Sequence, residues 1–417
     1  MKKNILLLLI LLFQCAFAQE KLSEIQKTEI TFRISGGIID SKTDSIISNA
    51  DLYLMNCNNS VVANSKGEFQ FNIPKSSFND KLIISVLGYY SDTISVSQLE
   101  KTKNEFLFIK LNKETNAEIT LNGLVVLSAK SKAKSISAKS ILKKAKENIE
   151  DNYFQEPFNQ KFFFRAQTNK DSLVTVNEEA SIQTYSPNGI KVSDDAVNDY
   201  YGEILQFGGD PYKIAKENWK GIGYFGVVIF RNILLSNRNV LYETSSFDLK
   251  KEGTLEYNGK KVYVISFTNL APDVFSTGFG DPSPKSVTGF IYIDTISFAV
   301  VKFEQYVVLT PYRPNESDDI RIESTLKITQ TYKLVNGKYF INYCNEKVED
   351  NYYSKTDRKL VSKSNTNYDL MSVDINTDNV EIITRPIDRL KLDVKLKEDP
   401  EYWKNNNFIL EEGKVDF

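Results

Sequence analysis

Two Ser-x-x-Lys pairs come closest to a catalytic motif in this sequence. Ser131 with Lys134, and Ser140 with Lys143, have the spacing that on a helix can place a lysine amine beside a serine hydroxyl and activate it as a nucleophile. The stretch around them is crowded with serine and lysine, so such pairs arise by chance. The companion Ser-Asp-Asn and Lys-Thr-Gly elements are missing. We therefore expect no serine catalysis at either place.

Adjacent carboxylates are the second pattern with chemical potential, because paired acids can hydrolyse a glycosidic bond. Glu178-Glu179 and Asp318-Asp319 qualify by residue type, but neighbouring residues of a strand point to opposite faces of a sheet. The segment from Glu316 to Asp319 offers oxygen ligands for calcium, although its spacing matches no ordered calcium loop. We expect solvated strand edges or loops at both places.

The chain contains no histidine. This absence removes Ser-His-Asp and Cys-His catalysis and histidine acid–base chemistry, and it removes the commonest zinc, copper and iron ligand. Outside the leader only Cys57 and Cys344 remain, and their spacing suggests neither a metal site nor a redox pair, so we expect two unpaired thiols. The sequence accordingly predicts no enzyme activity, no cofactor, and no catalytic, cofactor-binding or metal-binding residue.

A glycine-rich loop in the second half is the favoured contact surface. Gly278-Phe-Gly280-Asp-Pro-Ser-Pro284 lacks the lysine and the helix that follow in a phosphate-binding loop. Together with residues 271–277 it forms the longest irregular excursion of this half, and such loops often carry binding residues. Six aromatic residues of the predicted strands either fill a core, which we favour, or line an apolar cavity. These residues are Phe162, Phe164, Tyr263, Phe267, Tyr292 and Phe298.

The first residues predict export. Lys2 and Lys3 precede an apolar run from Ile5 to Phe13, and Ala16-Phe-Ala18 supplies the small residues that a signal peptidase reads. We predict a signal peptide over residues 1–18 and a location in the periplasm or at the outer membrane. Lipidation of Cys15 is disfavoured, because the preceding Gln14 is not small. The formal net charge of −2, without a basic face, gives nucleic-acid binding little support.

Residues 30–112 predict short strands separated by turns. Turn-forming residues lie at 40–44 and at 64–67, and strand-like patterns occupy 34–39, 50–55, 68–73 and 82–87. About seven short strands with frequent turns indicate a small antiparallel β-sandwich.

The same region resembles a known family. The runs Gly37-x-x-Asp40, Asn64-x-x-Gly67-x-Phe69-x-Phe71-x-Ile73 and Leu82-x-x-Ser85-x-x-Gly88-Tyr89 are similar to the carboxypeptidase-regulatory-like domain. The resemblance implies a transthyretin-like β-sandwich, common at the start of envelope receptors and anchored surface proteins, with no peptidase activity of its own. Ser65 stands where that family often has an aspartate, which argues against a cation at this turn.

The rest of the chain predicts a linker, a helix and a larger sheet. Residues 113–135 are polar and suit a linker, and an apolar stripe through Ile141, Ala145 and Ile149 predicts a helix that ends before Pro157. Residues 136–385 then form a helix plus an antiparallel β-rich domain, a curved sheet or an incomplete barrel with a few helices. Strands are predicted at 162–165, 172–185 and 240–244, and hairpins turn at Asn258-Gly259, near Asp294, and at Asn336-Gly337.

Three further segments complete the prediction. Asp210 as the cap and Pro211 in the first turn predict a helix over residues 212–219. The apolar run 224–235 is either a core element, which we favour, or a segment that touches a membrane or docks a partner. Residues 386–417 suit a charged, solvated C-terminal extension. The second region also resembles, at Glu179-Ala180 and Gly289–Asp294, uncharacterised envelope domains, and its sheet layout resembles the half-barrel of periplasmic lipoprotein carriers.

These observations favour an exported envelope protein with a non-catalytic binding or structural role. The expected partner is an envelope protein or a glycan, with peripheral association with the outer membrane and no nucleic acid. One alternative is a periplasmic carrier that encloses an apolar ligand, which requires an apolar cavity. Another is a carboxylate-dependent hydrolase, which requires two inward carboxyl groups in a cleft.

Overall fold

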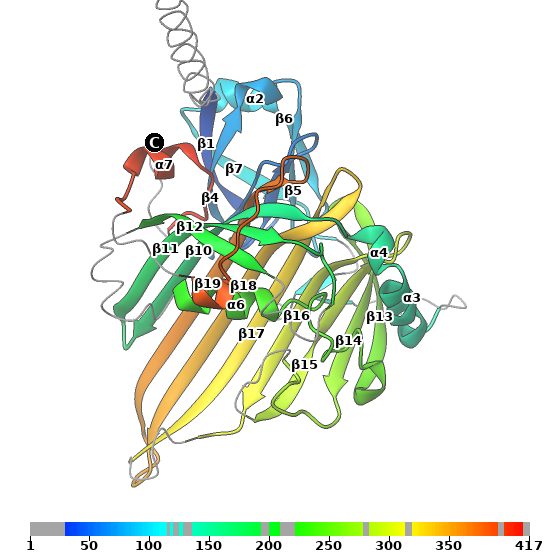
Figure 1. Ribbon diagram of the computed structural model, residues 1–417, viewed down its shortest axis with the longest axis vertical. Coiled ribbons are helices and arrows are strands. Elements are labelled where there is room, and N and C mark those ends of the chain that lie inside the picture. Colours follow the sequence, from blue (N-terminus) through cyan, green and yellow to red (C-terminus); the bar gives the residue numbers. More distant parts are fainter. Residues whose placement is uncertain are drawn as a thin grey trace, which may run out of the picture.

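The computed structural model describes residues 30–114, 117–119, 125–127, 136–192, 200–208, 222–277, 283–312, 319–390 and 396–411. A small β-sandwich stands at one end of a large twisted sheet (Figure 1). Several sequence predictions lie outside the described residues: the signal peptide, Ser131 and Lys134, the helix at 212–219, residues 316–318 and residues 278–282.

Seven strands form the sandwich in two sheets, with the orders β4-β1-β7 and β3-β2-β5-β6. The strands are β1 Thr31–Asp40, β2 Asp51–Leu54, β3 Ser60–Val62, β4 Glu68–Pro74, β5 Lys81–Ser85, β6 Asp92–Ser95 and β7 Phe106–Leu111; short helices η1 Lys75–Ser77, α2 Val96–Leu99 and η2 Glu100–Thr102 connect them. The predicted sandwich is confirmed. One pairing differs from the antiparallel expectation, because β1 and β7 run parallel.

A turn at Asn64–Gly67 shows why these residue types are needed. Gly67 has φ +69°, and a Cβ at this position would lie 2.8 Å from the carbonyl oxygen of Ile47. The Oδ1 atom of Asn64 accepts from the backbone N–H groups of Lys66 and Glu68, both at 2.9 Å. Glycine therefore supplies the left-handed backbone, and asparagine satisfies the turn's donors.

The connection to the second unit is partly ordered. Strands β8 (Ala117–Ile119) and β9 (Val125–Leu127) pair antiparallel, so the predicted linker contains a short hairpin. Helices α3 (Ala138–Glu147) and α4 (Ile149–Asn152) follow, and the side chain of Ser137 caps α3 by accepting from the N–H of Ser140 at 3.2 Å. The predicted apolar stripe through Ile141, Ala145 and Ile149 is buried, which confirms the helix.

Ten antiparallel strands form the large sheet, in the order β12-β11-β10-β19-β18-β17-β16-β15-β14-β13. They are β10 Phe158–Lys170, β11 Leu173–Ser186, β12 Tyr201–Gly208, β13 Phe247–Tyr257, β14 Lys260–Asn269, β15 Pro284–Asp294, β16 Val300–Leu309, β17 Ile320–Val335, β18 Lys338–Ser354 and β19 Leu360–Asn376. Two meanders meet where β10 pairs with β19, and the sheet stays open. The three predicted hairpins are confirmed, and the Asn-Gly turns have positive φ at both residues, for example +52° and +68° at Asn258 and Gly259.

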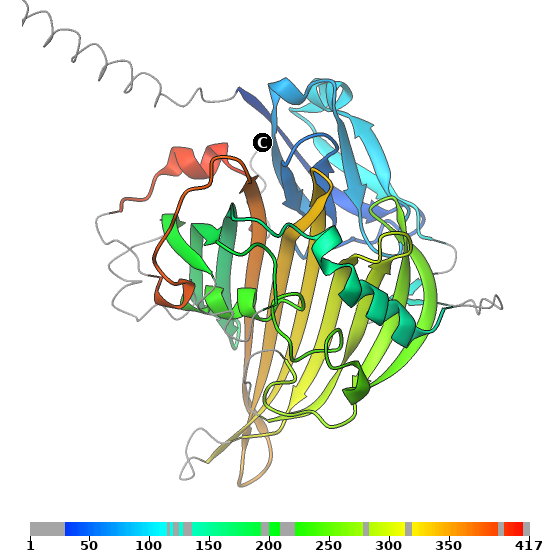
Figure 2. The same cartoon turned by 45° about the vertical axis from the view of Figure 1, so that its right-hand side comes forward.

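The two faces of this sheet pack against different partners. Along β10, Phe162 and Phe164 belong to one core together with α6 (Phe225–Phe230), whereas Phe163 belongs to the core of the sandwich. We call the first side the helix face and the second side the sandwich face. Figure 2 shows α3 and α6 lying across the helix face. Because successive side chains of a strand point to opposite faces of the sheet, neighbouring residues of β10 pack into two separate cores.

Two sequence predictions are wrong. Residues 240–244 form turns that lead into η5 (Thr244–Ser246). The side chain of Asn239 accepts from the backbone N–H of Leu241, and this local hydrogen bond takes the place of pairing with a neighbouring strand. The C-terminal segment is not a solvated extension where it is described: after η6 (Ile387–Arg389) it forms α7 (Pro400–Asn405) and buries Ile409 and Leu410. Its apolar residues pack on the sandwich core together with Phe163. No helix within the described residues is long and apolar enough to cross a membrane.

Candidate functional site

The Ser140–Lys143 pair on α3 does not form a catalytic dyad. The Oγ atom of Ser140 lies 2.9 Å from the Oγ atom of Ser137. The ammonium of Lys143 lies 3.7 Å from Oε1 of Glu147, one turn further along the same helix. Both side chains are exposed on a surface helix, so nothing desolvates the lysine.

The adjacent carboxylates Glu178 and Glu179 point to opposite faces, as expected. Oε1 of Glu179 accepts a 2.6 Å hydrogen bond from Nε of Arg165 on the sandwich face. Glu178 lies on the helix face near Tyr368. Burial is the main cause of the raised pKa of Tyr368, and the negative charge of Glu178 adds to it. Contrary to the expectation of a solvated edge, Glu178 is buried, and η4 (Ile222–Tyr224) packs against the same strand. Asp319 is exposed and bonds to Thr356 at 3.3 Å.

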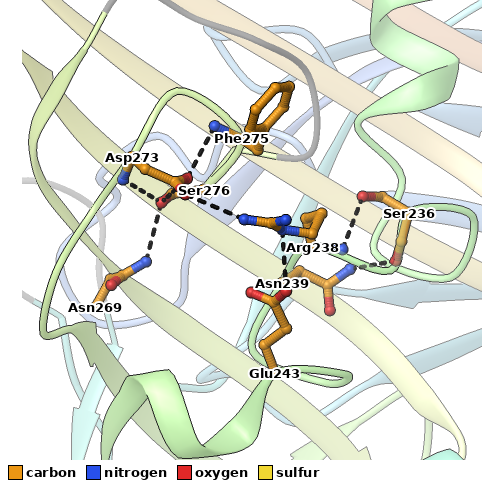
Figure 3. A network of polar contacts seen from close by, with 8 residues as sticks. All are labelled: Ser236, Arg238, Asn239, Glu243, Asn269, Asp273, Phe275 and Ser276. Atoms are coloured by element: carbon orange, nitrogen blue, oxygen red, sulfur yellow. Dashed lines mark hydrogen bonds and ion pairs between the residues drawn. The ribbon is translucent and has the colours of Figure 1, made fainter. Parts of the chain in front are cut away.

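The loop favoured as a contact surface is held by the neighbouring segment. Asp273 accepts from the N–H of Phe275 at 2.9 Å and from Nη2 of Arg238 at 3.1 Å, and Arg238 also reaches Glu243 at 2.9 Å (Figure 3). The Oγ atom of Ser276 links Asp273 to Asn269. The described part of this loop is therefore fixed by its own polar contacts, and a partner for it remains a prediction.

The helix face is filled by side chains. Phe225 of α6 packs edge-to-face on Phe162 and Phe164, with ring centroids 6.1 and 5.5 Å apart. Just beyond α6, Arg231 forms a buried ion pair with Glu346 of β18. Of the six aromatic residues considered, Phe162, Phe164, Phe267 and Tyr292 are buried, which confirms the core interpretation for these four. This filling counts against the apolar carrier.

A pocket of about 600 Å³ lies across β14 to β18. Its wall combines hydroxyl groups, two rings and charged side chains: Ser266, Thr268, Thr288, Phe290, Glu304, Tyr306, Thr325, Lys327, Lys347 and Glu349. Tyr306 is 42% exposed, so one ring is open to an incoming ligand. Pockets that place a few polar groups beside apolar rings are typical ligand sites.

A second pocket of about 560 Å³ adjoins the first, since Lys327 and Lys347 line both. It is rich in amide side chains: Gln167, Asn169, Asn345, Asn365 and Asn367 come from the sheet, and Asn49 and Asn64 from the sandwich. Arg165, Asp369 and Tyr343 line it as well. We call the two adjoining pockets the sandwich-face groove.

The C-terminal segment closes one side of this groove. Nη2 of Arg165 donates to the carbonyl oxygen of Ile409 at 2.7 Å, and Nδ2 of Asn64 donates to that of Leu410 at 3.3 Å. Asn72 of β4 and Asn407 exchange two hydrogen bonds, at 2.8 and 3.2 Å. Sheet, sandwich and C-terminal segment therefore all contribute to one pocket.

A network of hydrogen bonds orders the floor of the second pocket. Asp369 accepts from the hydroxyl of Tyr343 at 2.6 Å and from Nδ2 of Asn345 at 2.9 Å. Burial raises the pKa of Asp369, while these bonds and Arg165 oppose the rise. The amides are thus held in fixed orientations, which lowers the cost of ordering them around a ligand.

A third cavity, of about 540 Å³, lies between the sandwich and the hairpin ends of the large sheet. It contains Asp51, which bonds to Tyr257 and Asn342, and Lys333, whose ammonium donates to Ser60 at 3.1 Å. Burial lowers the pKa of Lys333 to about 8. Because these polar groups satisfy one another across the interface, we assign this cavity to the joint between the two units.

The described residues form neither a cluster of metal ligands nor a disulfide. No group of three or more potential metal-ligating residues of the His, Cys, Asp and Glu types occurs among the described residues. Cys57 and Cys344 are both free thiols. Burial raises the pKa of Cys344, so this thiol stays protonated and is a poor nucleophile.

Sequence reasoning missed the groove because its residues look like an ordinary solvated face. Asn345, Lys347 and Glu349 occupy every second position along β18, and Asn365, Asn367 and Asp369 do so along β19. Alternation of this kind identifies one face of a strand. It does not reveal that a second unit and the C-terminal segment enclose that face.

Comparisons with known proteins identify the first unit. Residues 34–126 match the family model of the CarboxypepD_reg-like domain. No curated protein matches the chain. Among solved structures, a DUF1329 family protein from Desulfovibrio piger is similar at 10% identity over 60% of this chain and 96% of its own, with a TM-score of 0.26. A LolA superfamily protein from Nitrosomonas europaea is similar at 12% identity over 59% and 96%, with a TM-score of 0.24. The family match begins within β1 and ends within β9, beyond the predicted boundary at 112: residues 34–126 of this chain are a CarboxypepD_reg-like domain.

Proposed function

We propose that the protein is a non-catalytic binding module of the bacterial envelope that holds a saccharide chain in the sandwich-face groove. The observation that carries the proposal is the convergence of seven amide side chains from the sheet and the sandwich on one pocket. Amide groups both donate and accept hydrogen bonds, as the hydroxyl groups of a saccharide do.

The first pocket supports the same ligand class. Tyr306 and Phe290 offer ring surface beside the hydroxyl groups of Thr288 and Thr325. Such a surface suits a sugar ring, which has an apolar face and a rim of hydroxyl groups. The two pockets adjoin, so a ligand of several sugar units fits along them better than a single compact molecule does.

Export supports an envelope setting for this binding. The leader predicted from Lys2, Lys3 and the apolar run that follows would deliver the chain out of the cytoplasm. Fractionation of cells that express the full chain with a C-terminal tag checks this part directly. Recovery of the processed protein in the periplasmic or outer-membrane fraction is expected, and recovery of unprocessed protein in the cytosol contradicts it.

Titration calorimetry of the mature protein with a panel of neutral and acidic oligosaccharides tests the ligand class. Tyr306→Ala is expected to weaken binding about tenfold, because it removes the exposed ring of the first pocket. Tyr90→Ala is the matched control, since Tyr90 lies on the sandwich outside the groove and is also 42% exposed. Equal binding by both variants, or no binding to any saccharide, contradicts the proposal.

A further inference from the structure

The junction of the two pockets contains two lysines that face each other. Lys327 of β17 and Lys347 of β18 are directly paired in the antiparallel register. Like charges in this position destabilise a sheet. Both residues line both pockets, so the unfavourable pair lies in the middle of the sandwich-face groove.

The two ammonium groups are compensated unequally. Lys347 forms a 2.7 Å ion pair with Glu349, and both side chains are 47% exposed. Lys327 is partly buried, and no hydrogen bond or ion pair joins its ammonium to another residue in the described part of the chain. The charges of Glu304, Lys302 and Lys347 act on it.

Glu304 compensates Lys327 only in part, because both of its oxygens are engaged with other residues. One accepts from the hydroxyl of Tyr292 at 2.8 Å, and the other lies 3.2 Å from the ammonium of Lys302. Burial lowers the pKa of Lys327, Glu304 opposes this, and Lys302 and Lys347 lower it further. Lys302, Lys327 and Lys347 carry three positive charges against the two carboxylates of Glu304 and Glu349, so one positive charge of the cluster is left unbalanced.

We infer that the groove takes an acidic saccharide, and that Lys327 and Lys347 together bind a carboxylate or sulfate group carried by one of its sugar units. This inference rests on the proposed function and names the class of its ligand. An anion between the two ammonium groups replaces their repulsion with attraction and restores a partner to the partly buried charge. The hydroxyl groups of Thr325 and Thr329, two residues to either side of Lys327 on β17, lie in position to donate to the same anion or to the sugar ring.

Three further acids line the groove, and each already has an interaction: Asp369, Glu349 and Glu411 of the C-terminal segment. Asp369 already accepts from Tyr343 and Asn345, and Glu349 is paired with Lys347. Arg165 is likewise committed, to Glu179 and to the carbonyl oxygen of Ile409. Lys327 is thus the charged group of the groove that gains most from an anionic ligand.

Calorimetry on the mature protein with two probes of equal length, hexagalacturonate and neutral maltohexaose, tests the inference. Hexagalacturonate is expected to bind more tightly, and Lys327→Met to weaken its binding by about tenfold or more, because a charged hydrogen bond is lost. Lys327→Arg keeps the charge and is expected to retain most of the affinity. Lys139→Met, which removes an exposed lysine of α3 on the helix face, serves as the control. Added salt is expected to weaken hexagalacturonate binding and to leave maltohexaose binding unchanged.

The outcomes separate this inference from the proposed function. If maltohexaose binds as tightly as hexagalacturonate and Lys327→Met changes neither, the acidic class is wrong and the saccharide site stands. If inorganic sulfate binds in a Lys327-dependent manner and neither oligosaccharide does, the anion site stands and the saccharide proposal falls. If none of the three probes binds the folded protein, both are overturned. Circular dichroism and the thermal midpoint of each variant verify that it is folded.

Discussion

The hydroxyl of Tyr257 donates a 2.7 Å hydrogen bond to Oδ2 of Asp51 and thereby joins the large sheet to the sandwich. The other carboxyl oxygen, Oδ1, accepts from Nδ2 of Asn342 of β18 at 2.8 Å. Burial raises the pKa of Asp51 to about 6, although Tyr257, Asn342 and the nearby lysines 302 and 333 oppose the rise. The joint between the two units therefore contains a carboxyl group that changes its charge in mildly acidic solution.

This joint is expected to make stability depend on pH. The pKa of Asp51 is higher in the folded protein than in the unfolded chain, so the folded protein holds the proton more tightly. This proton binding therefore adds to the free energy of unfolding below about pH 4, and the contribution is lost as the pH rises through about 6. The contribution is on the order of 3 kcal/mol. Urea unfolding at a series of pH values, with wild type and Asp51→Asn compared, measures it.

Asparagine at position 51 can still bond to both partners but cannot ionise, so the variant is expected to gain stability relative to wild type as the pH rises from about 4 to 7. Asp51→Asn and wild-type curves that run parallel over this range would show that the carboxyl is not perturbed by the interface.

Arg165 is expected to hold the C-terminal segment in place. Arg165→Met removes the ion pair with Glu179 and the 2.7 Å bond to the carbonyl oxygen of Ile409, at a cost of about 2 kcal/mol in the free energy of unfolding. Limited proteolysis is expected to cleave the C-terminal segment sooner in this variant. Arg321→Met is the control: its pair with Glu323 is exposed, and its loss should change stability by less than about 0.5 kcal/mol. Equal effects of the two substitutions would contradict this role for Arg165.

Phe225 tests whether the helix face is a packed core. Phe225→Ala is expected to lower the free energy of unfolding by about 3 to 5 kcal/mol, because the ring is fully buried against Phe162 and Phe164. Denaturant unfolding provides the value. A loss below about 1 kcal/mol, together with saturable binding of a fluorescent fatty acid by the wild-type protein, would restore the carrier alternative.

Gly289 marks a close approach between strands β15 and β16. A Cβ at this position would lie 2.1 Å from the carbonyl oxygen of Glu304 and 2.5 Å from the ring of Phe267. Gly289→Ala is therefore expected to destabilise the sheet by about 1 to 3 kcal/mol or more. Gly259→Ala provides a comparison in open space, where the cost comes only from the positive φ of +68° and amounts to about 1 kcal/mol. A smaller loss at Gly289 than at Gly259 would contradict the crowding.

Local features of the sequence were enough to predict several strands and turns of both units, although β12, β19 and α7 were not predicted and residues 240–244 are not a strand. Asn258-Gly259 and Asn336-Gly337 specify tight hairpins because asparagine and glycine tolerate the left-handed backbone, and the structure has positive φ at all four residues. The spacing of Asn64, Gly67 and Phe69 identified the first domain, because that turn and the strand after it are formed by neighbouring residues. The burial of most of the apolar run 224–235 also followed from its composition, although Tyr224 and Val227 are only half-buried.

The sandwich-face groove depended on contacts between distant parts of the chain. Lys327 and Lys347 become a pair only through the register of β17 and β18, and Arg165 meets the carbonyl oxygen of Ile409 across 244 residues. The charged composition of the C-terminal segment suggested a solvated tail, yet a few apolar residues such as Ile409 are enough to hold it against the sandwich core. The sequence by itself determined the tight hairpin turns and many of the strands, since those preferences are local. Only the tertiary structure decided which polar face is enclosed, because enclosure depends on which surfaces the folded chain brings together.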